Sequence, residues 1–256
     1  MTVEEKQKTA RFWDLITDYI YSGYRSPEKI YDFSDPAMII SGADAVHGKP
    51  ALRAQPPAFP ANDSLEKIAA EIKLCYNCSL GSTRINSVLG EGVFQPLVMV
   101  IGEGPGEDED KQGRPFVGKA GHQLDKMLAS INLSRNSNCF ITNVVKCRPP
   151  KNREPYPEEA AVCSHFLERQ ISLLKPKFIL AAGRVAAQAL LKTTEPISKM
   201  RGKFINFTAG GLTIPLIVTY HPAALLRNES LKRPTWEDLK LLRSMLLADL
   251  PADGGS

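Results

Sequence analysis

Short apolar runs alternate with segments of helical periodicity over the last two thirds of the chain. The apolar runs have the length and composition of buried strands, and they are PLVMVIG (96–102), CFITNVV (139–145), KFILAAG (177–183) and IPLIVTYHP (214–222). Helical spacing of apolar residues is found over residues 119–131, 157–174, 184–191 and 235–247. This alternation predicts a three-layer α/β/α fold, in which helices cover both faces of a central, mostly parallel sheet.

The first part of the chain has a different pattern. Residues 4–24 predict an N-terminal helix with one apolar stripe, which could dock on the main domain or on a partner. The stripe consists of Phe12, Trp13, Ile16 and Ile20. Residues 26–62 are rich in Pro, Ala and Gly, as is typical of a linker. We therefore expect a helix and linker over residues 1–62, a folded domain over residues 63–250 and a flexible tail over residues 251–256.

Composition and charge narrow the class of protein. With 256 residues, 43% of them hydrophobic, the chain is long enough for one sizeable α/β domain and an appendage. The formal net charge of +4 is mildly basic, so it permits a polyanionic partner without requiring one. No apolar run is long enough to span a membrane, and the acidic N-terminus does not resemble a signal peptide. These features predict a cytoplasmic protein that has no membrane partner.

Polar residues follow the predicted strands where ligands of such sheets usually bind, at the carboxyl ends. Glu103 follows the first strand, Asn143 lies near the end of the second, and His221 follows the last. The glycine-rich turn over residues 102–106 does not match a dinucleotide or P-loop motif, and the four acids after it would repel a phosphate. We expect this acidic run to be solvated or to begin a helix, with Glu109 near the rim of a pocket.

The cysteines predict a metal centre. Cys75 and Cys78 form a C-x2-C pair, and Cys147 and Cys163 form a second pair with 15 residues between them. Four thiolates suit either zinc or an iron–sulfur cluster, and the wide second pair favours the cluster. We expect the fifth cysteine, Cys139, to be a small buried hydrophobic residue.

Three motifs together carry a family resemblance. GEGPGEDEDKQGRPFVGKAG (102–121), ITNVVKCRPPKNR (141–153) and HPAALLRN (221–228) occur in this order, with cysteines before and between them. The chain resembles the family-4 uracil-DNA glycosylases from about residue 65 to residue 247. The resemblance implies an α/β/α fold, a [4Fe–4S] cluster bound by Cys75, Cys78, Cys147 and Cys163, and hydrolysis of the N-glycosidic bond of deoxyuridine in DNA.

The resemblance also implies roles for residues that bind the base. An enzyme of this kind flips the target base out of the helix and reads its hydrogen-bonding edge. Phe116 would stack on uracil, and the amide of Asn143 would pair with N3–H and O4, which cytosine cannot match. The turn formed by Gly104, Pro105 and Gly106 would bring backbone close to the base.

Two residues are candidates for catalysis. His221 would donate a hydrogen bond to uracil O2 as negative charge develops there, and the backbone N–H of Gly104 is a second candidate donor. Glu103 would position the attacking water or stabilise the positively charged sugar. The corresponding family-1 enzymes use an aspartate to activate the water, and here Gly104 stands at that place.

The DNA-binding candidates lie beside the motifs. We expect Arg114, Lys119 and Arg227 to contact the phosphate backbone, and Leu225 to enter the gap left by the flipped base. Further basic candidates are Lys146, Arg148, Lys151, Arg153, Arg184, Lys199 and Arg201. The sequence has Ala223 and Ala224 where the usual family motif reads HPSYLLR, so one phosphate contact and part of the wedge are lost. The loop after Lys146 has no histidine of the kind found in relatives that trap DNA covalently, which implies turnover.

Two other functions remain open. The first is a non-catalytic iron–sulfur DNA-binding module of a repair or replication complex, docked through the N-terminal helix. The second is a glycosylase for another damaged base such as hypoxanthine. We expect a monomer, with uracil-containing DNA as the main partner and a repair or replication protein as a candidate partner of the N-terminal helix.

Overall fold

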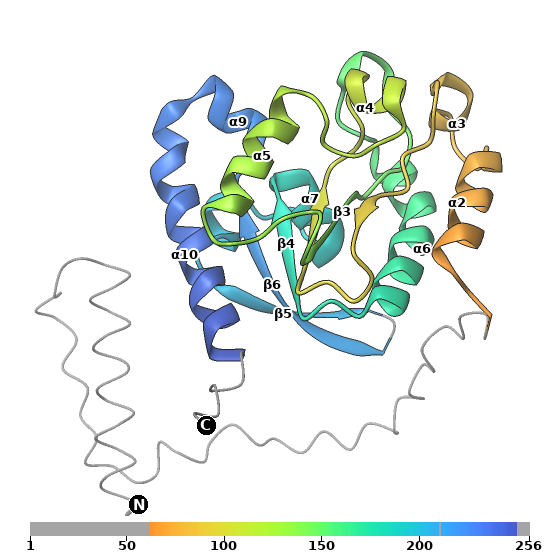
Figure 1. The fold of residues 1–256 in the computed structure, drawn as a ribbon. Coiled ribbons are helices and arrows are strands. Elements are labelled where there is room, and N and C mark those ends of the chain that lie inside the picture. Colours follow the sequence, from red (N-terminus) through yellow and green to blue (C-terminus); the bar gives the residue numbers. More distant parts are fainter. Residues whose placement is uncertain (1–61, 210, 250–256) are drawn as a thin grey trace, which may run out of the picture. The chain divides into compact units, whose positions relative to one another are not determined.

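The computed structural model describes residues 62–209 and 211–249, and their centre is a six-stranded sheet (Figure 1). The strands are β1 (Glu91–Gly92), β2 (Val98–Gly102), β3 (Cys139–Asn143), β4 (Phe178–Ala182), β5 (Phe204–Ala209) and β6 (Leu212–Thr219). Their order in the sheet is β1-β3-β2-β4-β6-β5. The four central strands run parallel to one another, whereas the edge strands β1 and β5 are antiparallel to their neighbours.

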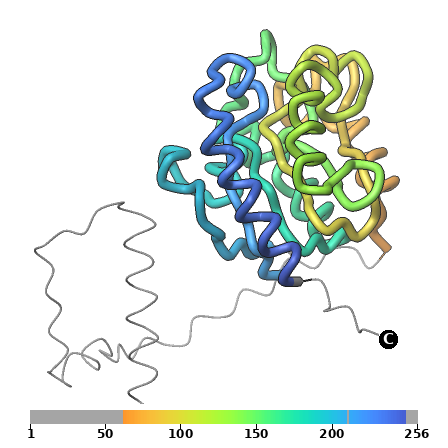
Figure 2. The backbone as a smooth tube through the Cα atoms, turned by 60° about the vertical axis from the view of Figure 1, so that its left-hand side comes forward, coloured from red at the N-terminus to blue at the C-terminus, as the bar shows by residue number. Residues whose placement is uncertain are grey.

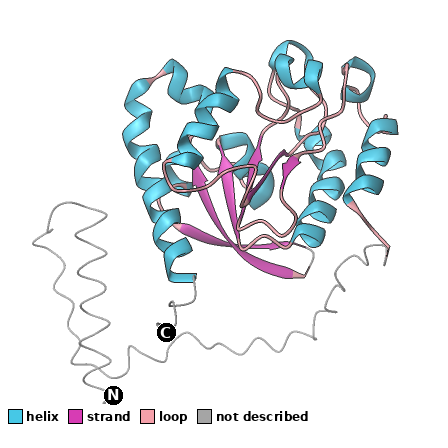
Figure 3. Cartoon of the chain, in the orientation of Figure 1, coloured by secondary structure: helices cyan, strands magenta, loops and turns pink. Residues whose placement is uncertain are grey.

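Helices cover both faces of this sheet (Figure 3). The α-helices are α2 (Leu65–Leu74), α3 (Leu80–Thr83), α4 (Glu107–Gln112), α5 (Lys119–Ala129), α6 (Pro157–Leu174), α7 (Arg184–Leu191), α8 (Ile197–Met200), α9 (Pro222–Arg227) and α10 (Lys232–Asp249). Two short 3-10 helices, η2 (Pro150–Asn152) and η3 (Glu229–Leu231), lie in the loops before α6 and before α10. The predicted three-layer fold with a mostly parallel sheet is confirmed.

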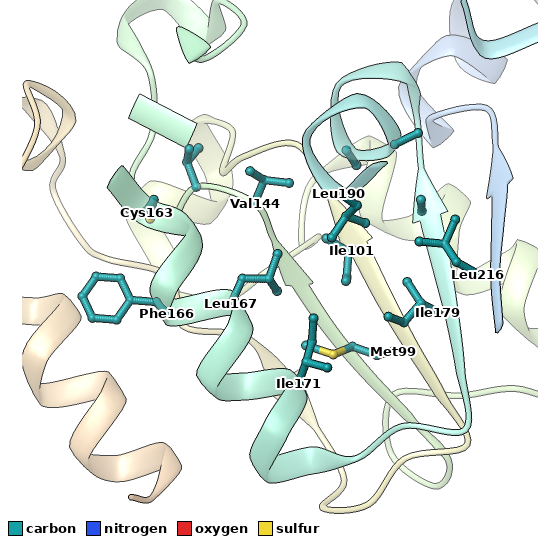
Figure 4. Packing of buried hydrophobic residues seen from close by; sticks show 14 of the residues in the cluster. Met99, Ile101, Val144, Cys163, Phe166, Leu167, Ile171, Ile179, Leu190 and Leu216 are labelled. Carbon is teal, nitrogen blue, oxygen red and sulfur yellow. The ribbon is translucent and has the colours of Figure 1, made fainter. Parts of the chain in front are cut away.

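The central strands separate two hydrophobic cores because successive side chains point to opposite faces. Val98 and Val100 of β2 pack in one core with residues of α5, α9 and α10. Met99 and Ile101 pack in the other core with residues of α2, α6 and α7. Figure 4 shows α6 side chains facing β2 and β4 in this second core. Figure 2 shows α10 and α5 running along the same side of the sheet.

The predicted elements agree with the structure in the interior and differ at the edges. Strands β1 and β5 were not predicted, because β1 has two residues and β5 alternates partly buried with exposed positions. The predicted last strand extended to residue 222, but β6 ends at Thr219 and His221 then begins α9 as its N-cap. The last helix begins three residues earlier than expected, at Lys232.

Several expectations concern residues outside the described part of the chain. The N-terminal helix over residues 4–24, its apolar stripe, the linker up to residue 61 and the tail over residues 251–256 all lie there. Within the described part, Ser64 is the N-cap of α2, and its side chain accepts a hydrogen bond from the backbone N–H of Lys67. Among the described residues, no helix has the length and apolar character needed to cross a membrane.

Candidate active site

Strands β2 and β3 end side by side at the carboxyl edge of the sheet. Gly102, the last residue of β2, is paired with Asn143, the last residue of β3. A Cβ atom on Gly102 would lie 2.4 Å from Asn143 Oδ1 and 2.5 Å from Phe116 Cζ. Only glycine leaves room for these two side chains at the end of β2, and the structure therefore brings Phe116 and Asn143 together.

The side chains of Asn143 and Phe116 define a candidate pocket at this edge, and Asn143 carries an unpaired buried acceptor. Asn143 is 2% exposed, and its Oδ1 atom has no hydrogen-bond partner among the described residues. Leaving such an atom unpaired costs about 1–3 kcal/mol, and native proteins rarely do so without a functional reason. The neighbouring Phe116 is buried and has a φ of 52°, in the left-handed region that is strained for a large side chain. A flat ligand with an N–H donor would complete this arrangement.

The turn after β2 approaches its neighbours closely. A Cβ atom on Gly104 would lie 2.7 Å from Val145 Cγ2, and one on Gly106 would lie 2.6 Å from Glu109 Oε2. Pro105 between them is buried. Gly104 therefore lets the turn pack directly against the loop after β3, and Gly106 lets it pack against Glu109 of α4.

Glu109 connects the two loops that form the pocket. Its carboxylate accepts a hydrogen bond from the N–H of Gly106 (3.0 Å) in the turn after β2. It also accepts from the N–H groups of Val117 (2.8 Å) and Gly118 (3.0 Å), directly after Phe116. These three bonds hold the Phe116 loop against the turn.

Two other acids of the run, Glu107 and Asp110, also have protein partners. Asp110 is buried, and its carboxylate accepts from the backbone N–H groups of Ile85 (2.9 Å) and Asn86 (3.1 Å). Glu107 forms an exposed ion pair with Arg148 across 3.3 Å. Of the two expectations for the run, the structure shows the helix: α4 begins at Glu107. Favourable interaction with the N-terminal end of the helix dipole and with these donors explains why four acids can follow the glycine turn.

His221 faces the same pocket as a neutral imidazole. Its Nδ1 atom accepts a hydrogen bond from the N–H of Ala223 (3.2 Å), which assigns the proton to Nε2. Burial lowers the pKa of His221 to about 4; Arg227 lowers it further and Glu109 opposes this. The imidazole ring centroid lies 5.7 Å from that of Phe116. His221 therefore presents an uncharged N–H donor near the ring of Phe116.

Glu103 is the acid that follows β2 directly. Burial raises its pKa to about 7, the negative charge of Glu154 adds to this rise, and Arg184 opposes it. Its backbone carbonyl accepts a hydrogen bond from the N–H of Val145 (3.1 Å), which fixes the residue beside the loop after β3. A carboxyl group that titrates near neutral pH is suited to proton transfer or to water activation.

The four paired cysteines line one small cavity. Cys75 follows α2, Cys78 lies between α2 and α3, Cys147 follows β3, and Cys163 lies in α6. Figure 4 shows Cys163 on α6 close to the end of the apolar core. The remaining cysteine, Cys139, is fully buried in the other core, and burial raises its pKa to about 12. The expectation that it is a buried hydrophobic residue is confirmed.

Two basic residues line the cysteine cavity. Arg84 donates hydrogen bonds from Nη1 to Cys147 Sγ (3.0 Å) and to the Cys75 carbonyl (2.8 Å). Lys146 also lines the cavity. Burial raises the pKa of Cys163 to about 11, and Lys146 opposes this rise. Because buried thiolates need positive charge nearby, these cations and the four thiols fit a thiolate-bound metal group.

The donor set of the cavity fits a thiolate-bound cluster. Four thiols line it together with Arg84 and Lys146, and each iron of a [4Fe–4S] cluster binds one thiolate. Among the described residues, no group of three or more Cys, His, Asp or Glu side chains that could hold a metal ion is found. The residue types present fit the cluster by the chemistry of their donors.

The DNA-binding candidates differ in how free their charges are. Lys119 and Arg227 are exposed, and the described part of the chain offers them no carboxylate partner. Arg114 is exposed, but its guanidinium binds Glu91 through two hydrogen bonds of 2.7 and 2.8 Å. Two further candidates, Arg153 and Arg184, pair with Glu159 and Glu154.

The burial and pairing of three residues do not support their sequence-based assignment to DNA contact. Lys146 is 1% exposed and cannot reach DNA. Arg201 is largely buried because its guanidinium binds the fully buried carboxylate of Asp238. Leu225 is 2% exposed and packs in the core between α5, α9 and α10, so it is not free to enter a base stack. Its neighbour Leu226 is 50% exposed and is the leucine of this motif that reaches solvent.

Comparison with known protein families shows to which superfamily the chain belongs. The family described as the Uracil DNA glycosylase superfamily matches residues 89–240, more than half of the chain. The match covers β2, β3, β4 and β6 with the loops at their carboxyl ends. The protein is therefore a member of the uracil-DNA glycosylase superfamily.

Individual relatives show to which type within this superfamily the chain belongs. The chain is 43% identical to a type-4 uracil-DNA glycosylase of Sulfurisphaera tokodaii over 189 residues, which cover 72% of this chain and 86% of that protein. It is 42% identical to one of Saccharolobus solfataricus (72% and 87%) and 41% identical to one of Thermotoga maritima (73% and 97%). The chain belongs to the type-4 uracil-DNA glycosylases, and the resemblance drawn from its three motifs is confirmed.

Two contacts of this region had no signal in the sequence analysis. Arg84 was not singled out, although it lies six residues after Cys78, where a cation near a metal centre could be suspected. The three-way contact of Glu109 joins segments that lie up to nine residues apart. Neither contact follows a periodic pattern, so only the folded chain reveals them.

Proposed function

We propose that the protein is a monofunctional uracil-DNA glycosylase, which takes deoxyuridine out of the DNA helix and hydrolyses its N-glycosidic bond. The reaction releases uracil and leaves an abasic site for base excision repair. The observation that carries the proposal is the unpaired, buried Oδ1 of Asn143 beside the ring of Phe116 at the end of β2. This is the acceptor that the N3–H of a flat pyrimidine would satisfy.

Asn143 would give the pocket its preference for uracil. Its Oδ1 accepts from uracil N3–H and its amide N–H donates to O4, while Phe116 covers the ring face. Cytosine presents an acceptor at N3 and a donor at its exocyclic amine, so the same amide would face unmatched groups. A buried site built to hydrogen-bond one edge rejects the reversed edge because the mismatched groups are left unpaired.

His221 would supply the main electrostatic contribution to catalysis. As the bond to the sugar breaks, uracil leaves with negative charge that spreads to O2. The hydrogen bond at Nδ1 holds the imidazole in place, so its neutral Nε2–H group can donate to O2 and stabilise this charge with no change of protonation state. The low pKa of His221, about 4, keeps the imidazole neutral at physiological pH.

Glu103 would act on the sugar side of the bond. In its ionised form, the carboxylate can orient a water molecule for attack at the anomeric carbon and stabilise the positive charge that develops on the sugar. Because its pKa is about 7, the ionised fraction rises through the neutral range. Gly104, Pro105 and Gly106 would complete the wall of the pocket.

Cys75, Cys78, Cys147 and Cys163 would hold a [4Fe–4S] cluster. The cluster would supply a structural link between α2, α6 and the loop after β3, since these three segments contribute its ligands. Arg84 would donate a hydrogen bond to the Cys147 sulfur, a contact that tunes such clusters.

DNA contact would fall to exposed cations around the pocket. Lys119 and Arg227 are the candidates with free charge, and Arg114 would have to share its guanidinium with Glu91. Leu226 replaces Leu225 as the candidate wedge because its side chain is exposed. A monomeric state and a repair or replication partner for the N-terminal helix stay predictions.

A single-site oligonucleotide assay tests this function. The protein, purified without oxygen, is incubated with 5′-labelled duplexes that carry uracil opposite guanine, uracil opposite adenine, cytosine or hypoxanthine, and with single-stranded uracil DNA. Alkali then cleaves any abasic site. We expect cleavage of the uracil substrates and none of the cytosine duplex. Cleavage of hypoxanthine DNA alone would indicate the other glycosylase, and DNA binding without cleavage would indicate the non-catalytic module.

A further inference from the structure

Lys146 is a buried cation that the roles above do not use. It is 1% exposed, and its Nζ donates hydrogen bonds to Thr142 Oγ1 (2.8 Å), the Asn143 carbonyl (2.7 Å) and Gln170 Oε1 (2.7 Å). All three acceptors are uncharged, and no carboxylate pairs with Lys146 in the described part of the chain. A buried charge is strongly unfavourable unless an opposite charge lies close by.

Lys146 lines the same cavity as the paired cysteines. Cys163 and Cys147 act on it electrostatically, and all three residues line the same cavity. An iron–sulfur cluster bound by four thiolates carries net negative charge. Such a group would provide the counter-charge that the protein itself does not supply.

Lys146 also contacts Asn143, the residue that we propose recognises the base. Lys146 has three N–H donors, and each is used. Two of the three acceptors belong to consecutive residues, Thr142 and Asn143, at the end of β3. Thr142 and Gln170 are fixed in turn, because each donates to the Leu89 carbonyl (2.7 and 2.8 Å). A shift of the Asn143 backbone would therefore break a charged, buried hydrogen bond.

We propose that Lys146 is a positioning residue with two linked effects: its ammonium neutralises part of the cluster's negative charge and fixes the backbone of Asn143. Cluster retention and uracil recognition would then depend on the same side chain. The proposal rests on the cluster and the uracil pocket proposed above, and it assigns Lys146 a role different from the DNA contact expected from sequence.

Two variants separate charge from positioning. Lys146→Met removes the charge and all donors but keeps an unbranched, buried side chain. Lys146→Gln removes the charge but keeps a donor amide that reaches part of the way to the same acceptors. Lys240→Met is the matched control, because Lys240 is an exposed lysine of α10 in an ion pair with Glu237.

The first measurements concern the cluster and not catalysis. Iron release to a chelator is followed by absorbance in anaerobic holoprotein, and the cluster's midpoint potential is measured by redox titration. We expect both Lys146 variants to release iron about 10- to 100-fold faster than the parent, the range seen when outer-shell partners of a metal site are lost. Both should shift the potential to more negative values, because loss of a nearby cation disfavours an added electron. Lys240→Met should change neither.

The second measurements concern the base. We expect Lys146→Met to lower kcat/KM for uracil DNA by about 100-fold through misplacement of Asn143, and to weaken competitive inhibition by free uracil. Lys146→Gln should recover part of both losses but not the iron retention. The salt dependence of DNA binding should equal that of the parent, because Lys146 does not touch phosphate.

The outcomes distinguish this proposal from the function on which it rests. A parent protein without iron or without uracil excision would overturn the proposed function. A parent that has both, together with Lys146 variants that keep the parent's potential, would overturn the role of Lys146 as counter-charge. If Lys146→Met does not fold, the same measurements on Lys146→Gln decide, and normal uracil inhibition in a variant with altered potential would refute the link to Asn143.

Discussion

Asn143 of the pocket and Cys147 of the cavity lie four residues apart in the sequence, but their surroundings differ in hydrogen bonding. The buried polar groups at the cavity are hydrogen-bonded, whereas a buried acceptor in the pocket is not. In the cavity, Lys146 and Arg84 have close hydrogen-bond partners. In the pocket, Asn143 Oδ1 is buried and unpaired among the described residues. Buried polar groups that are fully hydrogen-bonded stabilise one conformation. A buried acceptor without a partner can instead accept a hydrogen bond from a ligand.

The two regions also differ in charge. Arg84 and Lys146 line the cavity together with the four cysteines, which suits the negatively charged cluster that we propose there. The pocket keeps its titratable groups close to neutral: His221 is uncharged because burial lowers its pKa, and Glu103 is partly protonated because burial raises its pKa. A neutral pocket can accept a neutral base and still stabilise the charge that appears when the glycosidic bond breaks. Mutations in the cavity should therefore affect folding and iron, and those in the pocket should affect rate.

The largest effect is expected in the cavity. Cys147→Ala removes one thiolate, so iron should fall from about four per chain to a small fraction of that value, with loss of the brown colour and of uracil excision. Iron analysis and thermal unfolding measure the change. Cys139→Ala is the matched control because Cys139 is buried in the other core, and it should keep the iron content of the parent. Equal iron loss in both variants would mean that the cavity holds no cluster.

The next effect concerns the unpaired acceptor in the pocket. Asn143→Asp replaces the donor half of the amide by a second acceptor, which should lower kcat/KM for uracil DNA by about 10⁴-fold and should reduce the rejection of cytosine. Excision from uracil and cytosine duplexes measures both. Asn136→Asp, on an exposed loop, should behave as the parent. Parent-level uracil excision by Asn143→Asp would remove this residue from base recognition.

Replacement of His221 tests whether its side chain contributes to the rate of uracil excision or to DNA binding. His221→Ala should lower the single-turnover rate by about 10²- to 10³-fold while DNA affinity stays near that of the parent, because the donor acts on charge that appears only in the transition state. Arg227→Ala should show the reverse, with weaker binding and a salt slope smaller by about one unit. Single-turnover kinetics with enzyme in excess and a salt titration of binding make the comparison. A saturated His221→Ala enzyme that cleaves at the parent rate contradicts the assignment.

The pH dependence should report Glu103 and not His221. If the carboxylate is the active form, kcat/KM should rise with pH through a pKa of about 7 and be about tenfold lower at pH 6 than on the plateau. Glu103→Gln should be slower and lack this rise. Stability should change in the other direction: a raised pKa means that the folded state holds the proton more tightly, so this stabilising contribution is lost as pH rises from about 4.5 to 7. A pH–rate profile and thermal unfolding over the same range test both signs.

The smallest effect on activity is expected at the two leucines of α9. Leu226→Ala should lower excision from duplex DNA a few-fold, leave single-stranded DNA unaffected and hardly change stability, since Leu226 is exposed. Leu225→Ala should instead lower the free energy of unfolding by about 2–5 kcal/mol, because it leaves a cavity in the core. Unfolding curves and paired duplex and single-strand assays distinguish the two. A duplex-specific defect in Leu225→Ala at normal stability would return the wedge to Leu225.

The sequence by itself determined the parts of this protein that depend on local pattern. Apolar runs and helical periodicity fixed the α/β/α layers, because burial on both faces of a parallel strand requires a continuous apolar run. The same patterns placed Glu103, Asn143 and His221 near strand ends, and the motifs identified the family. Edge strands β1 and β5 escaped prediction because partial exposure leaves no such pattern.

The tertiary structure alone decided which side chains are free. Lys146, Arg201 and Leu225 look like surface residues of basic or DNA-binding motifs, yet each is taken up by partners distant in sequence: Gln170 lies 24 residues from Lys146, and Asp238 lies 37 residues from Arg201. Exposure and hydrogen bonding arise from such contacts, and no local window of sequence contains them. The sequence therefore showed which chemical group stands at each position. Only the folded chain decides whether that group is exposed and unpaired, and so able to contact DNA, a base or a cluster.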